Sequence, residues 1–321
     1  METPTADRPT RAAVSAGILL VFAAVTGWWM LLIDGVGAVT GTEYTRGAHI
    51  VRAVGATLFV IPLIALMLRF PVRLRWSELG LTGWQPGGRQ FVSGAACWAV
   101  PALLTLAVLV GAGRAELSVQ APMVEIAGAL VGLTALVLLY EAIPEELVFR
   151  GYFFTVLAGR FAPVRAAVGQ AALFTAWGAL NGGQVSVDRT VLFALFATVL
   201  GALRVATGSL WSCMGFHTAF QVTAQFFSES WTEMELHDPD LTVTAVAFVA
   251  APFASTAGLL WWQRRLDSRC PGRLTRKSKK PAPRRGFPGW SAPRWRGRSE
   301  PAGPSDPARS RTRHADPHRG T

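Results

Sequence analysis

The segment from Tyr140 to Phe154, YEAIPEELVFRGYFF, places three glutamates and an arginine inside one of the most apolar stretches of the chain. A charged side chain at the centre of a membrane-spanning helix costs about 2.5–3.5 kcal/mol on insertion scales, so it needs a partner or a function. Glu146 and Arg150 are four residues apart and are expected to form an ion pair on one helix face. Glu145 has no such partner, and Glu141 adds negative charge one turn earlier. We therefore interpret the cluster as a functional polar site rather than a purely structural ion pair.

A second polar pair lies in another apolar segment, LWSCMGFHTAFQVTAQFF. His217 is the only histidine within the membrane spans predicted below, and a lone histidine on an apolar helix is more often a packed core residue than a ligand. Gln221 follows one turn later on the same face, which favours an inward-facing polar site. We expect this imidazole and amide to meet the glutamates of the first segment.

The elements that must position these residues are membrane helices. Hydrophobic residues make up 51% of the chain and charged residues only 16%. Uncharged or nearly uncharged runs at 12–33, 53–68, 90–113, 126–158, 166–187, 190–203, 205–228 and 241–263 predict an all-α polytopic membrane protein with about eight transmembrane helices. The fourth run would reach about 50 Å as a straight helix, so we expect it to tilt, to kink or to continue past the membrane, with Pro144 as the obvious position of a kink.

The distribution of charge predicts an orientation. Loops on one side of the predicted bundle carry Arg69, Arg73, Arg75, Arg89, Arg160 and Arg165. Loops on the other side are rich in acids: Asp34, Glu43, Glu116, Glu125, Glu229, Glu233, Glu235, Asp238 and Asp240. Because basic loops stay in the cytoplasm, both termini are expected there. The frequent Ala, Gly, Arg and Pro residues are typical of a GC-rich bacterial genome, which points to the plasma (inner) membrane.

Three regions follow from this pattern: a short cytoplasmic N-terminus (1–11), a transmembrane helical domain (12–263) and a basic cytoplasmic tail (264–321). The tail holds 17 Lys or Arg and 4 Asp or Glu, a net of +13, which leaves 14 against 16, or −2, for the rest of the chain. It cannot bury an apolar core and is expected to be disordered. It is interpreted as a solvated anchor or as a site of attraction to anionic lipid headgroups. The predicted partners therefore include the bilayer and no nucleic acid.

Two motifs resemble one known family. Glu145-Glu146-Leu-Val-Phe-Arg150 looks like the Glu-Glu-x-x-x-Arg motif of the CAAX protease and bacteriocin-processing (CPBP, or Abi) family. The stretch from Thr207 to Trp211, leading to His217, resembles the approach to that family's last motif, His-x-x-x-Asn or Asp. The resemblance covers about residues 85–227. It implies an intramembrane endopeptidase that acts on a membrane-associated peptide or protein.

The resemblance also implies roles for the residues. Glu145 or Glu146 would act with His217 on a water molecule as general base and later proton donor, while Arg150 orients Glu146. An amide, from Asn181 or Gln221, would stabilise the oxyanion. The family is commonly described as metalloproteases, so zinc or another divalent metal is a candidate cofactor, with Glu145 and His217 as its ligands. No organic cofactor is predicted.

The chain departs from the family at the middle motif. The pattern Phe-x-x-x-His falls on Phe174 to Gly178, so glycine replaces the histidine, and Asn181 lies one turn further on. The last motif also differs, because Gln221 stands where Asn or Asp is expected. Gly178 and Gly182 form a small-xxx-small pattern that permits close helix packing. Two hypotheses stay open: an active peptidase that uses these residues, and a catalytically silent scaffold for a membrane peptide or for immunity.

Overall fold

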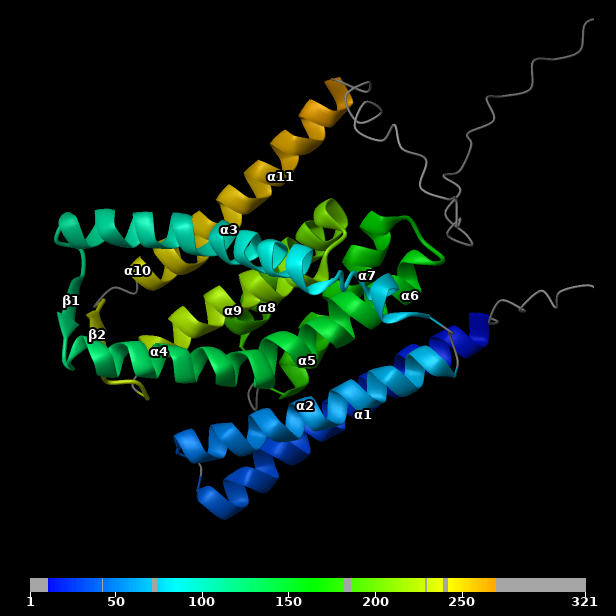
Figure 1. Cartoon of the computed structure of the whole chain (residues 1–321), viewed down its shortest axis with the longest axis horizontal. Coiled ribbons are helices and arrows are strands. Elements are labelled where there is room, and N and C mark those ends of the chain that lie inside the picture. The colour runs from blue at the N-terminus through cyan, green and yellow to red at the C-terminus, as the bar shows by residue number, and fades with distance from the viewer. Residues whose placement is uncertain are drawn as a thin grey trace, which may run out of the picture. The chain divides into compact units, whose positions relative to one another are not determined.

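The computed structural model describes residues 11–41, 43–70, 74–181, 186–228, 230–238 and 242–269 (Figure 1). Its elements, in chain order, are α1 (Arg11–Thr40), α2 (Arg46–Arg69), the 3₁₀ turn η1 (Trp76–Leu79), α3 (Trp84–Gly111), β1 (Glu116–Val119), α4 (Met123–Val137), η2 (Leu138–Ala142), α5 (Ile143–Glu146), η3 (Leu147–Phe153), α6 (Phe154–Ala158), α7 (Pro163–Asn181), α8 (Val187–Thr207), α9 (Leu210–Phe226), β2 (Met234–His237), α10 (Thr242–Ala245), η4 (Val246–Ala250) and α11 (Ala251–Arg269). Residues 270–321 of the predicted tail and all but the last residue of the predicted N-terminal region lie outside the described residues. The predicted start of the tail at 264 is wrong, because helix α11 continues to Arg269, with Arg265 packed over the ring of Trp261.

The protein is an integral membrane protein with an all-α polytopic bundle. Each of the eight predicted apolar segments is helical along most of its length. Six helical spans are long and apolar enough to cross a bilayer: Val14–Thr40, Arg46–Arg69, Trp76–Gly111, Met123–Ala158, Val187–Thr207 and Val243–Leu266. The predicted count of eight is not confirmed, because α7 and α9 are not among the six. α9 has 17 residues, which reach only about 26 Å at 1.5 Å per residue.

Two of the boundaries that differ from the predicted ones lie just before His217. The run predicted to begin at 205 instead starts after a turn, because α8 continues to Thr207 and α9 begins at Leu210. Gly208 makes this turn with a φ of +65°, a conformation that favours glycine. Ser209 then caps α9, with its hydroxyl accepting a hydrogen bond from the backbone N–H of Ser212. The turn fixes where the helix bearing His217 starts.

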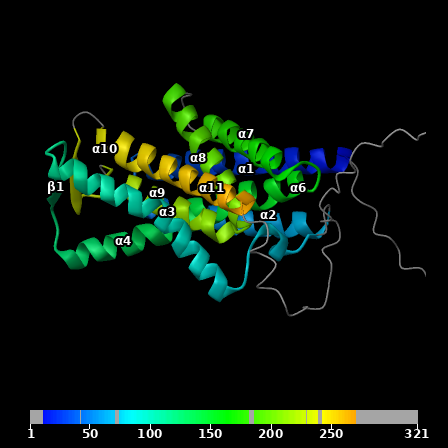
Figure 2. The same ribbon diagram turned by 90° about the horizontal axis from the view of Figure 1, so that it is seen from above.

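A short antiparallel pair of strands, absent from the predictions, joins two of the acid-rich loops. Glu116 pairs with His237 and Val119 with Met234. β1 connects α3 to α4, and Figure 2 shows it at the end of the bundle where these helices meet. Arg46, at the start of α2, pairs with Glu233 and lies 4.3 Å above the Trp231 ring. These contacts tie the loops together at one end of the helical bundle.

The long segment from Met123 to Ala158 is a continuous but irregular helix. Two stretches of it, η2 and η3, have the wider π-helical turn, and α5 lies between them. Pro144 sits near the start of α5, between the two π-helical stretches. The predicted bend at this proline stays a prediction. π-helical turns within α-helices are frequent at functional sites. Here they present Glu141, Glu145, Glu146 and Arg150 to the interior.

α9 is held against α3 by two glycines. A Cβ atom at Gly94 would collide with the backbone of Ser212, and one at Gly215 would collide with the backbone of Phe91. Small residues permit this close approach of helices in membranes. Gly215 lies two residues before His217, so the packing sets the depth and rotation of the histidine.

Candidate functional site

The glutamates of the long irregular helix meet the histidine of α9. Oε1 of Glu146 lies 3.0 Å from Nη1 of Arg150 and 2.9 Å from Nδ1 of His217. Glu146 and Arg150 have no exposed surface, and His217 is 1% exposed. The ion pair expected from the i, i+4 spacing is confirmed, and His217 contacts the glutamates as predicted.

The other nitrogen of His217 faces the second glutamate. Nε2 lies 3.8 Å from Oε2 of Glu145, longer than a hydrogen bond but close enough for one water molecule to contact both atoms. Because the Glu146 carboxylate is an acceptor, Nδ1 of His217 carries the proton that it donates there. A neutral His217 therefore presents the Nε2 lone pair toward Glu145. Arg150, Glu146 and His217 thus form a chain of contacts that ends at Glu145.

Aromatic rings surround the Arg150 guanidinium. Its Cζ lies 4.2 Å from the centroid of the Phe174 ring and 5.8 Å from that of Phe196. A desolvated guanidinium above an aromatic face gains about 2 kcal/mol or more. Nε of Arg204 donates to the carbonyl of Arg150, which fixes the backbone at the same point. Arg150 is therefore rigidly held, and Glu146 with it.

A cavity of about 320 Å³ lies beside this chain of contacts. Aromatic and aliphatic side chains form most of its wall: Trp29, Ile33, Tyr140, Phe174, Trp177, Leu192, Phe193, Phe196 and Phe220. Its polar lining is Glu141, Glu145, Asn181, Arg189, His217 and Gln221. Glu145, His217, Asn181 and Gln221 thus line one cavity, and their catalytic roles stay predictions. Glu146 and Arg150 lie behind it and support His217.

Asn181 is the last residue of α7, and its amide is half engaged. Nδ2 donates to the carbonyl of Trp177, and Oδ1 is buried without a hydrogen-bond partner among the described residues.

Glu141 accepts two hydrogen bonds from Nε2 of Gln225, at 2.8 and 3.0 Å. Gln225 was not among the predicted site residues, although it lies one turn after Gln221 on the face of His217.

A second histidine also lies within the helical bundle. The predicted second span began at 53, but α2 begins at Arg46, so it includes His49. His217 is therefore not the only histidine in a spanning helix. His49 is 4% exposed, its Nδ1 lies 2.9 Å from the Tyr44 hydroxyl, and its ring packs edge-on against Tyr140 at 5.6 Å. Since Tyr140 lines the cavity, His49 supports one of its walls.

Gly178 lies in the cavity wall where the family's middle histidine would be. A Cβ atom added there would overlap the ring of Phe193 on α8. Phe193 stacks on Phe174, with ring centroids 5.4 Å apart. The close packing of α7 on α8 supports the structural interpretation of Gly178. A phenyl ring thus fills the space that a histidine side chain at 178 would need.

The Gly178→His variant is expected to lose about 1–3 kcal/mol of stability or more, because the imidazole overlaps Phe193. In the Gly178→His/Phe193→Ala variant the ring is gone and the imidazole fits, so stability should return to that of Phe193→Ala alone. The double variant should also gain bound zinc, since a third donor then faces the cavity. Thermal unfolding and metal content of the purified proteins test this. A stable Gly178→His single variant would contradict the proposed overlap.

The residues present do not match a zinc site. Within the described ranges, no group of three or more His, Cys, Asp or Glu residues is arranged to hold a metal ion. Glu145 and Nε2 of His217 are two donors that face the cavity, and Nδ1 of His217 is engaged with Glu146. Zinc sites generally use at least three protein ligands. The metal ligation by Glu145 and His217 stays a prediction.

Comparison with known families bears on the same residues. Residues 127–223 match the family model described as Type II CAAX prenyl endopeptidase Rce1-like. Over this segment the chain resembles CAAX endopeptidases. The resemblance predicted from the two motifs is thereby confirmed over a part of the predicted 85–227 range. The segment runs from α4 into α9 and so contains both motifs, whereas α1, α2 and α3 lie outside it. No curated protein matches the chain.

Proposed function

We propose that the protein is an intramembrane endopeptidase that hydrolyses a peptide bond of a membrane-associated substrate. The observation that carries the proposal is the placement of Glu145 opposite Nε2 of His217, in a cavity, with His217 held by Glu146 and Arg150. A carboxylate facing an oriented imidazole is an arrangement suited to general acid–base catalysis. The similarity to CAAX prenyl endopeptidases supports the same reaction.

In the proposed reaction, a water molecule lies between Oε2 of Glu145 and Nε2 of His217. Glu145 removes a proton as the water oxygen bonds to the scissile carbonyl carbon, which yields a tetrahedral oxyanion. Asn181 and Gln221 supply amide groups in the cavity that can donate to this oxygen once their side chains turn toward it. Glu145 then returns the proton to the leaving amine as the carbon–nitrogen bond breaks.

A prenylated C-terminal peptide is the substrate class that the family name suggests for this chain. The aromatic cavity wall suits an apolar substrate that lies in the bilayer. We further propose that the protein resides in a bacterial plasma membrane with both termini in the cytoplasm, because the basic residues gather at one end of the bundle.

The proposal is tested with purified protein in liposomes and a fluorescence-quenched CAAX peptide that carries a farnesylated cysteine. Wild type is expected to cleave it, and His217→Ala to lose activity by about 10²–10⁴-fold, because the water loses one of its two partners. Glu125→Gln, an exposed residue at the start of α4, is the control and should cleave normally. Full activity of His217→Ala would contradict the proposed site.

A catalytically silent scaffold is the second candidate. The observation that favours it is the Phe193 ring in the space of the missing histidine. A scaffold would bind the farnesylated peptide without cleaving it, and binding would weaken when cavity residues such as Trp29 are replaced. Fluorescence anisotropy of the labelled peptide beside the cleavage assay separates the two functions.

A further inference from the structure

The exposure of the cavity lining rises toward one end of the bundle. On α8, Phe196 is buried, Phe193 is half-buried and Arg189 is exposed. On α9, His217 is buried, Gln221 is half-buried and Ala224 is exposed. These helices run in opposite directions, so both gradients point to the same end. The cavity therefore opens where α7 ends and α8 begins.

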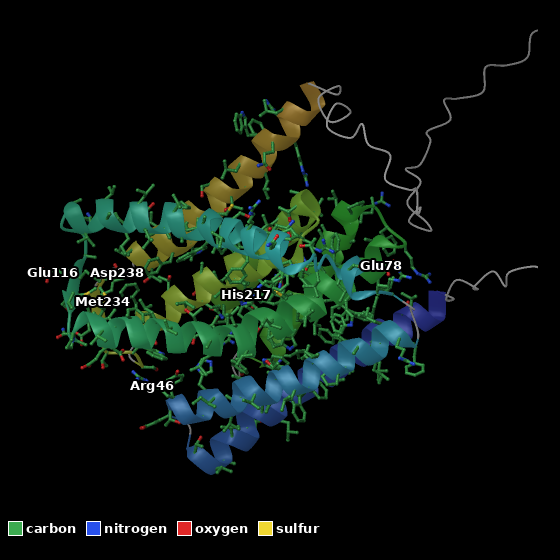
Figure 3. The ribbon with its side chains drawn as sticks, in the orientation of Figure 1. Arg46, Glu78, Glu116, His217, Met234 and Asp238 are labelled. Atoms are coloured by element: carbon green, nitrogen blue, oxygen red, sulfur yellow. The ribbon has the colours of Figure 1, made fainter. Side chains whose placement is uncertain are left out.

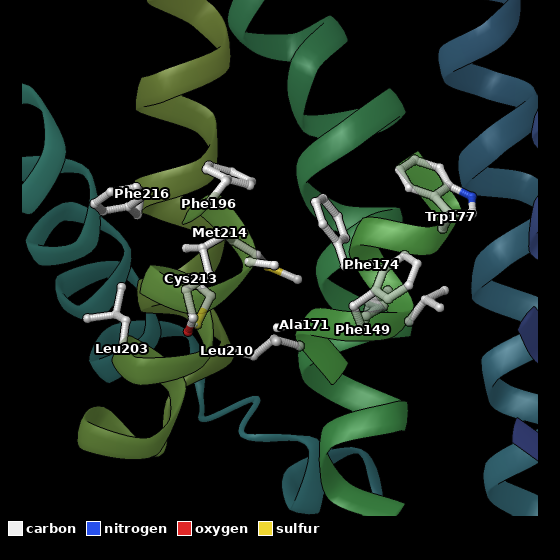
Figure 4. Close-up of a cluster of buried hydrophobic side chains, with 14 of the residues drawn as sticks. Phe149, Ala171, Phe174, Trp177, Phe196, Leu203, Leu210, Cys213, Met214 and Phe216 are labelled. Atoms are coloured by element: carbon white, nitrogen blue, oxygen red, sulfur yellow. Dashed lines mark hydrogen bonds between the residues drawn. The ribbon is translucent and has the colours of Figure 1, made fainter. Parts of the chain in front are cut away.

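The other end of the cavity is closed by packed side chains. Beyond Glu145 and His217 lie apolar residues that are at most 3% exposed: Phe149, Phe153, Leu210, Cys213 and Met214. Figure 4 shows the side chains of Phe149, Leu210, Cys213 and Met214 in this cluster, between α9 and the neighbouring helices. Protein interiors of this kind hold few voids large enough for water. Water and substrate thus have no route to Glu145 from that end.

The open end is the one that carries the strands. α4 begins just after β1 and α9 ends just before β2, and the helices between them alternate in direction through short turns. Asn181 and Arg189 therefore lie toward the strand end. In Figure 3, His217 lies between the end where Glu116, Met234 and Asp238 are labelled and the opposite end near Glu78.

The two ends differ in their basic residues. The closed end carries Arg69, Arg75, Arg89, Arg160, Arg165, Arg264 and Arg265. The strand end carries Arg46, Arg52, Arg114 and Arg189 together with the acids Glu116, Glu125, Glu233, Glu235 and Asp238. The excess of arginine marks the closed end as cytoplasmic. The strand end then faces away from the cytoplasm.

We infer that the cavity opens on the extracytoplasmic side, so that the segment to be cleaved reaches Glu145 from the outer half of the bilayer. The partner is a membrane-anchored polypeptide whose scissile segment lies outside the cytoplasm. Cleavage of this polypeptide rests on the proposed peptidase function, whereas the direction of the opening rests on burial and charge alone.

Cysteine accessibility tests the inference. In a full-length chain with Cys97, Cys213 and Cys270 replaced by serine, single reporters are introduced as Ala224→Cys in the cavity, Ser118→Cys in β1 and Phe161→Cys in the turn after α6. Val168→Cys, on an exposed face of α7, is the lipid-facing control. Spheroplasts and inverted vesicles are treated with a membrane-impermeant thiosulfonate. Thiols that were not blocked are then labelled with a fluorescent maleimide after denaturation. The same labelling without the thiosulfonate reports the total amount of protein.

We expect Ala224→Cys and Ser118→Cys to lose maleimide labelling in spheroplasts and to keep it in inverted vesicles. Phe161→Cys should show the reverse, and Val168→Cys should be labelled in both. If Ala224→Cys follows Phe161→Cys, or stays labelled in both preparations, the inferred opening is wrong. If Ser118→Cys is blocked only in inverted vesicles, the inferred sidedness is wrong. Labelling needs no turnover, so an inactive protein would overturn the proposed function and leave this result unaffected.

Discussion

Replacing Glu145 with glutamine is expected to lower peptide hydrolysis by about 10²–10⁴-fold, the contribution typical of a positioned general base. Glutamine keeps the size and hydrogen-bonding capacity of the side chain but cannot take a proton from water. Glu145 faces the cavity and Nε2 of His217, whereas Glu146 is fully buried between Arg150 and Nδ1. The loss should therefore appear in kcat, with binding of the farnesylated peptide retained.

Glu125→Gln is the matched control for this substitution, because it makes the same chemical change at an exposed position of the same helical segment. Cleavage assays in liposomes, together with peptide anisotropy, separate catalysis from binding. An active Glu145→Gln enzyme would exclude Glu145 as the base. Loss of peptide binding in this variant, with insertion unchanged, would favour a binding role for the carboxylate instead.

Replacing Arg150 with methionine is expected to destabilise the protein by about 3–5 kcal/mol, the usual cost of breaking a buried ion pair from one side. The change leaves Glu146 fully buried without its cation and also removes the packing of the guanidinium on Phe174. His217 would then lose the orientation that Glu146 provides. Thermal unfolding in detergent should show a lower midpoint, and cleavage should fall with it.

The double variant Glu146→Gln/Arg150→Met separates charge from packing. It removes both charges and leaves an amide oxygen that can still accept from Nδ1 of His217, so part of the lost stability should return. Arg165→Met, at an exposed position near the start of α7, should unfold like wild type. If the double variant is no more stable than Arg150→Met, an uncompensated charge is not the cause of the loss.

Much of this site could be predicted from local spacing. Glu146 and Arg150 are one helical turn apart, and that distance along the chain is enough to pair them. His217 could be singled out because a polar residue in an apolar helix is expensive. In contrast, His49 was missed because Arg52 interrupts the uncharged run, so the span was predicted to begin at 53, whereas α2 begins at Arg46. Gln225 lies on the same helix face as His217 and Gln221, but its partner Glu141 is 84 residues away along the chain, so spacing alone did not pair them.

The sequence by itself determined that the chain is a helical membrane protein, that three glutamates and an arginine share one apolar segment, and that glycine stands at position 178. Hydropathy and i, i+4 spacing are local properties, so they can be read along the chain. Only the tertiary structure decided which imidazole nitrogen meets which glutamate, that Phe193 fills the space beside Gly178, and which end of the cavity is open. Each of these depends on how helices distant in sequence pack against one another. That packing is determined by how side chains from different helices fit together and by how each helix is rotated, and neither leaves a local pattern in the sequence.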